Sequence, residues 1–499
     1  MVAQRVASAS LAGLGLWFVS VAAAAATGPP FTWHVITLPP ASGTFSTAEP
    51  GIAISAGGTA IANAASANTG APPTAWISHD GGGSWGPAID FDITGASTGD
   101  ADAAIGADGK LYALNLAFEN PPGQPANPTV FVFRSLDGSS WQGPATFPPP
   151  HGSDQPDRPW LVVDPQRPAD VDVFHSEGGG NIVEWQSQDH GATFTGPITV
   201  SSGANSQAAL ALSSRPLFDP SDDSRIVMFY ETVTAAGLAS TLAAQPPVYE
   251  FPMTQIWMAV SSDSGATWSN QLVLDTTTLS GSPLQSATLG HLLVASAIDT
   301  GGGLYAAFSL RQNGATATAI YLMHSENHGA SWSAPSLVSS PSMSNVMPAL
   351  EVSGGNAYLS WYGTTDADFR DGNAVWYEMF AATPNPQAGI PSFDVAQVSA
   401  VPAHVGGINT AGNVGSNLGA NWGLRDLQSI AVDACGLPHP IWAVDDGQPA
   451  TMTASPDESA TCSATTQVPE VPVHPLLVVS AATAVFVYGL HLRRRRRIA

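Results

Sequence analysis

A short motif, S-x-D-x-G-x-[ST]-[WF], returns along this chain of 499 residues and limits what the chain can fold into. It occurs as "SHDGGGSW" from Ser78, "SQDHGATF" from Ser187 and "SSDSGATW" from Ser261. Two further copies depart from it: "SLDGSSW" from Ser135 is one residue short, and "SENHGASW" from Ser325 has Asn in the Asp position. Successive Asp/Asn positions are 57, 52, 74 and 64 residues apart. Such spacings suit one four-stranded sheet with variable loops per copy.

Each residue type in the motif suits a tight β-turn. Carboxylate and hydroxyl oxygens accept hydrogen bonds from backbone N–H groups of the turn, and Gly supplies a positive φ. The final Trp or Phe is expected to pack between neighbouring sheets. Each copy follows a β-rich run such as "TVFVFR" or "QIWMAV". The predicted structural positions are Ser78, Asp80, Gly82, Trp85, Asp137, Trp141, Asp189, Gly191, Phe194, Asp263, Gly265, Trp268, Asn327, Gly329 and Trp332.

The five copies resemble the Asp-box (BNR) repeats of the sialidase-like β-propeller superfamily. The resemblance covers roughly residues 31–450 and implies an all-β propeller of four-stranded antiparallel blades. We count seven blades, with six as the alternative. The early strand "TWHVITL" from Thr32 is expected to pair into the last blade and seal the ring. Such repeats occur in enzymes and in binding proteins, so they do not identify the function.

The two ends of the chain predict export and anchoring. Residues 1–26 have the positive start, apolar run and small-residue end of a signal peptide, with an uncleaved anchor as the alternative. After the propeller (27–450) and a linker (451–474), residues 475–492 form a predicted transmembrane helix, followed by a basic tail at 493–499. The basic tail should stay cytoplasmic, which places the propeller outside, at the cell surface. The C-terminal segment also resembles prokaryotic sorting tags, whose helix is removed.

The exterior part of the chain is strongly acidic. Arg5 and the five arginines from Arg493 to Arg497 lie in the two ends, so nine of the 15 basic residues remain against 39 acidic ones, a formal charge of −30. Lys110 is the sole lysine. Such a body should repel phosphate backbones, which excludes nucleic acid as a partner. Cys435 and Cys462, the only cysteines, are predicted to form a disulfide outside the cell.

The resemblance also indicates which face of the propeller binds ligands. Asp boxes lie between the third and fourth strands of a blade, so the second-to-third loops and the links between blades share the opposite face, where ligands of such propellers generally bind. Only eight arginines lie outside the two ends, and four of them map to this face: Arg158, Arg311, Arg370 and Arg425.

Two interpretations of these arginines remain open. Arginines hold carboxylates bidentately, and sialidases bind their sugar acid with three of them. The resemblance then implies Tyr362 as nucleophile, Glu231 as its activator and Asp102 as acid/base. Alternatively, the arginines pair with nearby Asp residues and brace the loops. Residues 27–77 contain no Arg or Lys, which departs from the sialidase pattern.

The leading functional hypothesis is therefore a surface propeller that binds an extracellular carbohydrate or another surface ligand on the face opposite the Asp boxes. An exo-α-sialidase-type glycoside hydrolase acting on acidic sugars is the first alternative, and a structural or adhesive envelope protein is the second. No metal ligands are assigned and no cofactor is required. The acidic loops Thr364–Asn373 and Asp219–Ser224 are alternatives for Ca²⁺, although neither has EF-hand spacing.

Overall fold

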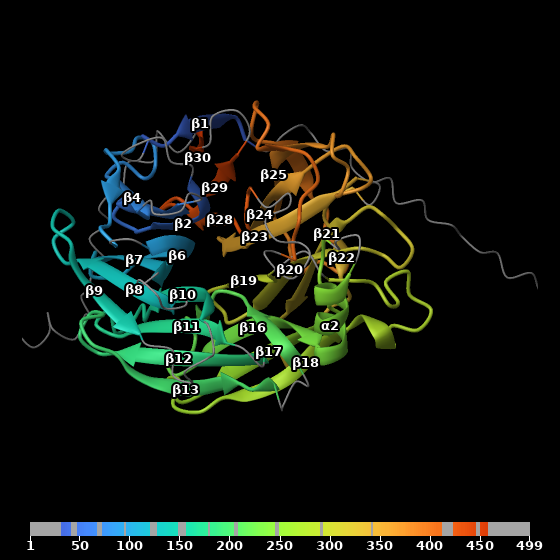
Figure 1. Cartoon of the computed structure of the whole chain (residues 1–499), viewed down its shortest axis with the longest axis horizontal. Helices are drawn as coiled ribbons and strands as arrows, with labels where there is room; N and C mark the ends of the chain where they lie inside the picture. The colour runs from blue at the N-terminus through green and yellow to red at the C-terminus, as the bar shows by residue number, and fades with distance from the viewer. Residues whose placement is uncertain are drawn as a thin grey trace, which may run out of the picture.

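The chain forms a ring of seven antiparallel sheets, as predicted for a seven-bladed all-β propeller (Figure 1). The computed structural model describes residues 31–40, 47–66, 72–93, 96–119, 127–147, 156–177, 180–203, 208–244, 249–289, 293–340, 343–411, 423–445 and 450–457. Within these ranges helix is limited to α2 (Ala235–Ala243) and the 3-10 turn η2 (Thr276–Thr278).

The first four blades each run outward from an inner strand. The first contains β2 (Thr47–Ile54), β3 (Ala60–Ser66), β4 (Thr74–Ser78) and β5 (Ile89–Asp90). The second contains β6 (Ala96–Ile105), β7 (Leu111–Glu119), β8 (Asn127–Ser135) and β9 (Gln142–Phe147). The third contains β10 (Asp157–Val163), β11 (Val171–Glu177), β12 (Asn181–Ser187) and β13 (Thr195–Ser201). The fourth contains β14 (Ala208–Ser213), β15 (Leu217–Phe218), β16 (Ile226–Thr234), β17 (Gln255–Ser261) and β18 (Ser269–Asp275).

The last three blades complete the ring. The fifth contains β19 (Ala295–Ile298), β20 (Leu304–Leu310), β21 (Ala319–Ser325) and β22 (Ser336–Leu337). The sixth contains β23 (Asn345–Ser353), β24 (Asn356–Gly363), β25 (Val375–Thr383), β26 (Asp394–Gln397) and, beside β25, β27 (His404–Val405). The seventh contains β28 (Ser429–Val432), β29 (Pro438–Val444), β30 (Ala450–Pro456) and β1 (Trp33–Thr37).

The N-terminal strand closes the ring, as expected from the sequence. β1 pairs with β30 in antiparallel register, from Trp33 opposite Pro456 to Thr37 opposite Met452. Since β30 is held between β29 and β1, the last blade extends past the boundary predicted at residue 450 and takes in the start of the predicted linker. Closing the ring pairs a strand edge that would otherwise be exposed.

Several predictions on the two ends of the chain fall on residues that the structure does not describe. These are the signal peptide (1–26), the transmembrane helix (475–492), the basic tail (493–499) and Cys462. Cys435 is disulfide-bonded, and Cys462 is the only other cysteine of the chain. In the described ranges, no helix has the length and apolar character needed to cross a membrane.

The repeated motifs form the turns between the third and fourth strands of the first five blades. In the third blade, Asp189 Oδ1 accepts hydrogen bonds from Ala192 N and Thr193 N, both at 2.9 Å. Ser187 Oγ accepts one from Gly191 N, also at 2.9 Å, and Gly191 has a φ of 72°. The side chains of the motif thus satisfy backbone donors within their own turn.

The final aromatic ring of a turn packs towards the preceding blade. Three edge-to-face pairs show this, with ring centroids 4.9, 5.9 and 5.5 Å apart: Trp141 with Phe91, Trp268 with Phe174, and Trp332 with Phe229. These contacts join neighbouring sheets, in the geometry that aromatic rings prefer. The turns therefore brace the outer part of the ring and leave the face opposite them for other roles.

Candidate functional site

Irregular backbone positions recur near the start of the inner strands. Five non-glycine residues at or just before an inner strand have a positive φ, between 53° and 60°: Glu49, Arg158, Leu293, Met347 and Arg425. Register shifts, typical of β-bulges, occur there in β2, β10 and β23. A bulge redirects a side chain. In three of the five the next residue is proline, which is the sequence signal that could have located these positions.

Four charged side chains meet where the first, second, third and seventh blades begin; we call them the mouth cluster. They are Glu49, Asp100, Arg158 and Asp426, with exposed fractions of 1%, 4%, 5% and 3%. Arg158 Nη2 donates to Asp426 Oδ2, and its backbone N–H donates to Asp100 Oδ2 at 2.9 Å. Its Nη1 lies 3.5 Å from Asp100 Oδ1 and 3.6 Å from Glu49 Oε1. Arg158 therefore links the third blade to the first, second and seventh blades.

The electrostatics of the mouth cluster follow from burial. Burial lowers the pKa of Arg158, but the charges of Asp426 and Asp100 overcome this and raise the pKa, so the guanidinium stays protonated. Burial also raises the pKa of Glu49 well above its usual range, and Asp100 and Asp426 raise it further. The charges of Arg425 and Arg158 oppose that rise. One cation cannot fully stabilise three buried carboxylates.

The four arginines predicted to bind ligand form two pairs. Arg425 lies beside the mouth cluster: its charge lowers the pKa of Glu49, and its Nη2 donates to Ser66 O at 3.4 Å. Arg158 and Arg425 therefore act on one carboxylate, Glu49. The alternative in which the arginines pair with nearby acids agrees with this geometry: the close pair joins Arg158 to Asp426, in another blade, while Asp157 Oδ1 is 4.0 Å from Arg158 Nε.

Arg311 and Arg370 form the second pair, from the fifth and sixth blades. Arg370 holds Asp368 bidentately, with Nε 2.7 Å from Oδ1 and Nη2 2.9 Å from Oδ2. Arg311 Nη2 pairs with Glu250, and its Nη1 donates to Ala315 O at 3.0 Å. Thus Arg158, Arg311 and Arg370 each hold a carboxylate of the chain itself. Their role in holding a ligand carboxylate stays a prediction.

Asp102 is buried below the mouth cluster, in β6. Its Oδ1 accepts a hydrogen bond from Ala103 N at 2.8 Å and its Oδ2 accepts one from Leu161 N at 2.9 Å. Arg215 Nε lies 3.6 Å from Oδ2. Burial raises the pKa of Asp102, while Arg215 and the two backbone donors oppose the rise. Its oxygens thus bind backbone groups of the second and third blades.

Tyr362 and Glu231 lie in different blades, on β24 and β16. The Tyr362 hydroxyl accepts a hydrogen bond from Ala443 N at 3.0 Å, and the ring is fully buried. Burial, and then the charge of Glu378 opposite it on β25, raises the pKa of Tyr362 well above its usual range. Burial likewise raises the pKa of Glu231. The carboxylates that influence Tyr362 are Glu378, Asp445 and Glu49.

A cavity of about 90 Å³ lies among the inner strands of the third, fifth, sixth and seventh blades; we call it the central cavity. Its wall combines one aromatic ring with polar and charged groups: Trp160, Arg215, Ser296, Glu351, Asp426 and Gln428. Asp426 also belongs to the mouth cluster, so the two features adjoin. Our sequence reasoning missed Glu49, Arg215, Glu351 and Gln428, because nothing local marks an inner-strand residue as facing the axis.

Two side chains set the chemistry of the central cavity. Arg215 reaches from the fourth blade across to two others, since its Nη2 donates to Ala103 O at 2.9 Å and to Leu161 O at 3.3 Å. Gln428 Nε2 donates to Met347 O at 2.9 Å, while its Oε1 is buried and accepts no hydrogen bond. An unsatisfied buried acceptor in a cavity wall favours a ligand with hydroxyl donors.

The two acidic loops considered for Ca²⁺ hold their carboxylates differently. Asp219 Oδ1 accepts from Ser221 N at 2.9 Å, and its Oδ2 lies 3.2 Å from His328 Nδ1. Asp368 holds Arg370, and Asp371 Oδ1 accepts from Asn373 N at 2.8 Å. Within the described residues, the group of three carboxylates that could share one ion is instead in the mouth cluster.

No protein-family model matches the chain. A search of curated proteins finds no match either. Among solved structures the chain is similar to the BP39L lectin from Burkholderia pseudomallei, with 13% identity, 81% of this chain and 98% of that chain covered, and a TM-score of 0.49.

Two further structures are similar at the same level. A protein of unknown function from Dyadobacter fermentans has 12% identity over 84% of this chain and 97% of that chain, with a TM-score of 0.44. The NanB sialidase from Streptococcus pneumoniae has 12% identity over 76% of this chain and 71% of that chain, with a TM-score of 0.43. Such distant likeness carries no argument about function, which has to come from the site.

Proposed function

We propose that this protein is an exported, membrane-anchored propeller that binds a carbohydrate at the central cavity, on the face opposite the repeat turns. The turns are Asp boxes in this proposal, and they serve as structural braces. The observation that carries it is the wall of the cavity, where a buried Gln428 oxygen without a hydrogen bond lies among Trp160, Arg215 and Glu351. Sugars combine hydroxyl donors with apolar ring faces, which is the combination that such a wall recognises.

The size of the cavity limits what enters it. A volume of about 90 Å³ holds several water molecules. It therefore takes a terminal part of a glycan, while the rest of the ligand lies over the mouth of the ring. Glu351 and Arg215 face this space, and the pKa of Glu351 is raised to about 7 by burial, against the charge of Arg215. Near neutral pH this carboxyl can donate or accept a hydrogen bond.

Binding fits the site better than hydrolysis of an acidic sugar. Hydrolysis would need free arginines around one carboxylate and a tyrosine hydroxyl that reaches the substrate. Arg158, Arg311 and Arg370 each hold an acid of the chain, and the Tyr362 hydroxyl is buried against Ala443. These contacts support a carbohydrate-binding protein without a sialidase reaction.

The test is a glycan array, followed by calorimetric titration of the purified protein with the best ligand. Gln428→Leu removes the unsatisfied acceptor, and Gln397→Leu, on outer strand β26, is the matched control. We expect Gln428→Leu to weaken binding about three- to tenfold, the value of one hydrogen bond, and the control to leave it unchanged. Absence of glycan binding by folded protein would overturn the proposal, and turnover of a fluorogenic sialoside would replace it with the hydrolase.

A further inference from the structure

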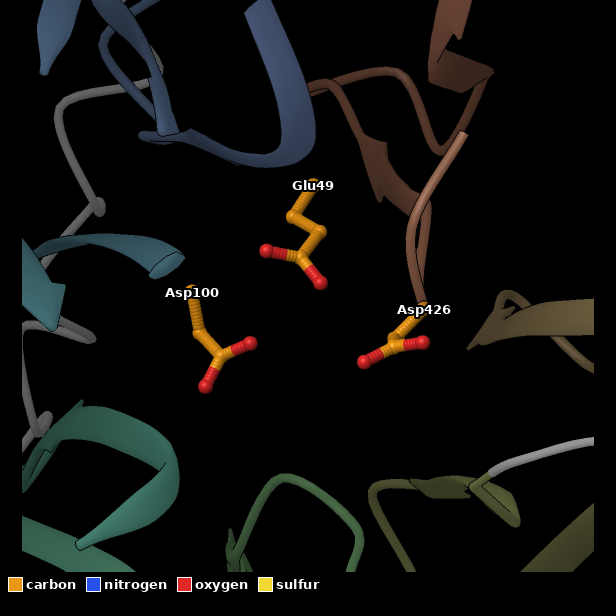
Figure 2. A group of neighbouring side chains, drawn as sticks. All are labelled: Glu49, Asp100 and Asp426. Atoms are coloured by element: carbon orange, nitrogen blue, oxygen red, sulfur yellow. The ribbon is translucent and has the colours of Figure 1, made fainter. Parts of the chain in front are cut away.

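We propose that the mouth cluster binds a divalent cation, Ca²⁺, between Glu49, Asp100 and Asp426. Each residue offers one carboxylate oxygen, and these oxygens lie within 4.8 Å of one another. Figure 2 shows the three carboxylates pointing from separate segments of the ring into one space. Ca²⁺ binds oxygen ligands at about 2.3–2.6 Å, so two ligands on opposite sides of the ion are at most about 5 Å apart. The spacing fits one ion.

The side chain of Glu49 gives a second, independent reason. Both of its carboxylate oxygens are buried and neither accepts a hydrogen bond, although only 1% of the residue is exposed. Its closest cationic contact is Arg158 Nη1 at 3.6 Å, which is too long for a hydrogen bond. A buried carboxylate without hydrogen bonds is costly, and a coordinated cation would satisfy both oxygens at once.

The charge balance gives the valence of the ion. Three fully buried carboxylates in the mouth cluster face one fully buried guanidinium, that of Arg158, so the formal charges of the four side chains sum to −2. The partly exposed Asp157 and Arg425 next to them carry opposite charges and leave that sum unchanged. A single divalent cation neutralises the cluster, and Arg158 can keep its bond to Asp426 beside it.

The three ligands come from the first, second and seventh blades, which flank the place where β1 closes the ring. A cation there would join the first blade to the last. Ca²⁺ should therefore stabilise the folded protein by RT ln(1 + c/Kd), where c is the free Ca²⁺ concentration, as any ligand that binds only the native state does. Nothing in this proposal depends on the carbohydrate.

The experiment titrates EDTA-treated, dialysed full-length protein with CaCl₂ by calorimetry and measures Tm with Ca²⁺ and with EDTA. We expect one ion per chain and a higher Tm in Ca²⁺. Glu49→Gln should weaken Ca²⁺ binding about tenfold or more, because it removes a charged ligand. The matched control is Asp371→Asn, in the acidic loop of the sixth blade, which should bind Ca²⁺ as the wild type does.

The two conditions separate a ligand from a merely structural residue. In EDTA, Glu49→Gln should melt at or above the wild-type Tm, because a buried carboxyl group without hydrogen bonds is gone; in Ca²⁺ it should melt below it. Should Glu49→Gln fail to fold, Glu49→Asp keeps the charge, shortens the side chain and should bind more weakly. Absence of Ca²⁺ binding by the wild type, its loss in Asp371→Asn, or full affinity in Glu49→Gln would overturn the proposal.

Discussion

Two glycines at the same position of the repeat turn should respond differently to alanine. Gly191 and Gly265 both have positive φ, 72° and 83°, and both donate to the first serine of their motif, at 2.9 and 2.8 Å. A Cβ on Gly191 would meet Phe194 Cζ at 3.6 Å, an ordinary contact. A Cβ on Gly265 would overlap Gln186 Nε2 and Glu184 Oε1. Both Ala variants should therefore lose similar stability through backbone strain, but only Gly265→Ala should lose more through steric overlap.

The size of the difference follows from what holds Glu184 in place. Its Oε2 accepts from Trp268 Nε1 at 2.8 Å, and its Oε1 from Gln186 Nε2 at 3.0 Å; that same Nε2 also donates to Ser264 O at 2.9 Å. The left-handed conformation costs each alanine about 1–2 kcal/mol. Displacing the Glu184 side chain would break two or three further hydrogen bonds, worth about 1 kcal/mol each. Gly265→Ala should therefore lose about 2–3 kcal/mol more stability than Gly191→Ala.

Urea unfolding of both variants, followed by tryptophan fluorescence, measures this difference as a shift in midpoint at constant slope. In a Gln186→Ala background, part of the obstruction is removed and the extra cost of Gly265→Ala should shrink. Equal destabilisation by Gly191→Ala and Gly265→Ala, within about 0.5 kcal/mol, would refute the steric explanation and leave backbone conformation as the whole effect.

Two further predictions concern buried ionisable groups. Burial raises the pKa of Glu184 from 4.5 to about 7, against hydrogen bonds from Gln186 and Trp268, so its contribution to stability is full below about pH 4.5 and is lost as pH rises through 7. Glu184→Gln should remove about 3 kcal/mol of that decline, measured as Tm against pH; an unchanged profile would contradict the assignment. Tyr362→Phe leaves Ala443 N–H without its acceptor, and should cost about 1–3 kcal/mol in urea unfolding without changing glycan affinity. A loss of sialoside turnover in Tyr362→Phe would instead identify a nucleophile.

The fold could be predicted because its decisive signal is local. In the repeat turns, side-chain oxygens accept hydrogen bonds from backbone N–H groups up to four residues further along, as Ser187 does from Gly191 and Asp189 does from Ala192 and Thr193. Five such turns at blade spacing leave few alternatives to a propeller. The strand that closes the ring was also predictable, since the last blade would otherwise have an exposed edge, and the N-terminal strand that begins near Thr32 can pair with it.

The site was less predictable, because its contacts are not local. Arg158 and Asp426 are 268 residues apart and meet only because the ring brings the third and seventh blades together. The arginine count pointed to one face of the ring, a prediction that stays open, but it could not show which acid each arginine meets. Glu49 was missed entirely: the proline after it marks an irregular position in the strand, but does not show which charged groups of other blades its side chain meets.

The side-chain oxygens of the repeat turns differ from two oxygens near the inner strands in how they are satisfied, and this difference supports a ligand site near the inner strands. In the repeat turns, the carboxylates of Asp80 and Asp189 accept hydrogen bonds from donors of their own turns. Near the inner strands, the oxygens of Glu49 and Gln428 are buried and accept no hydrogen bond. Buried polar atoms without partners destabilise a fold. We propose that an ion completes Glu49 and a carbohydrate completes Gln428; these two sites adjoin through Asp426, which belongs to both.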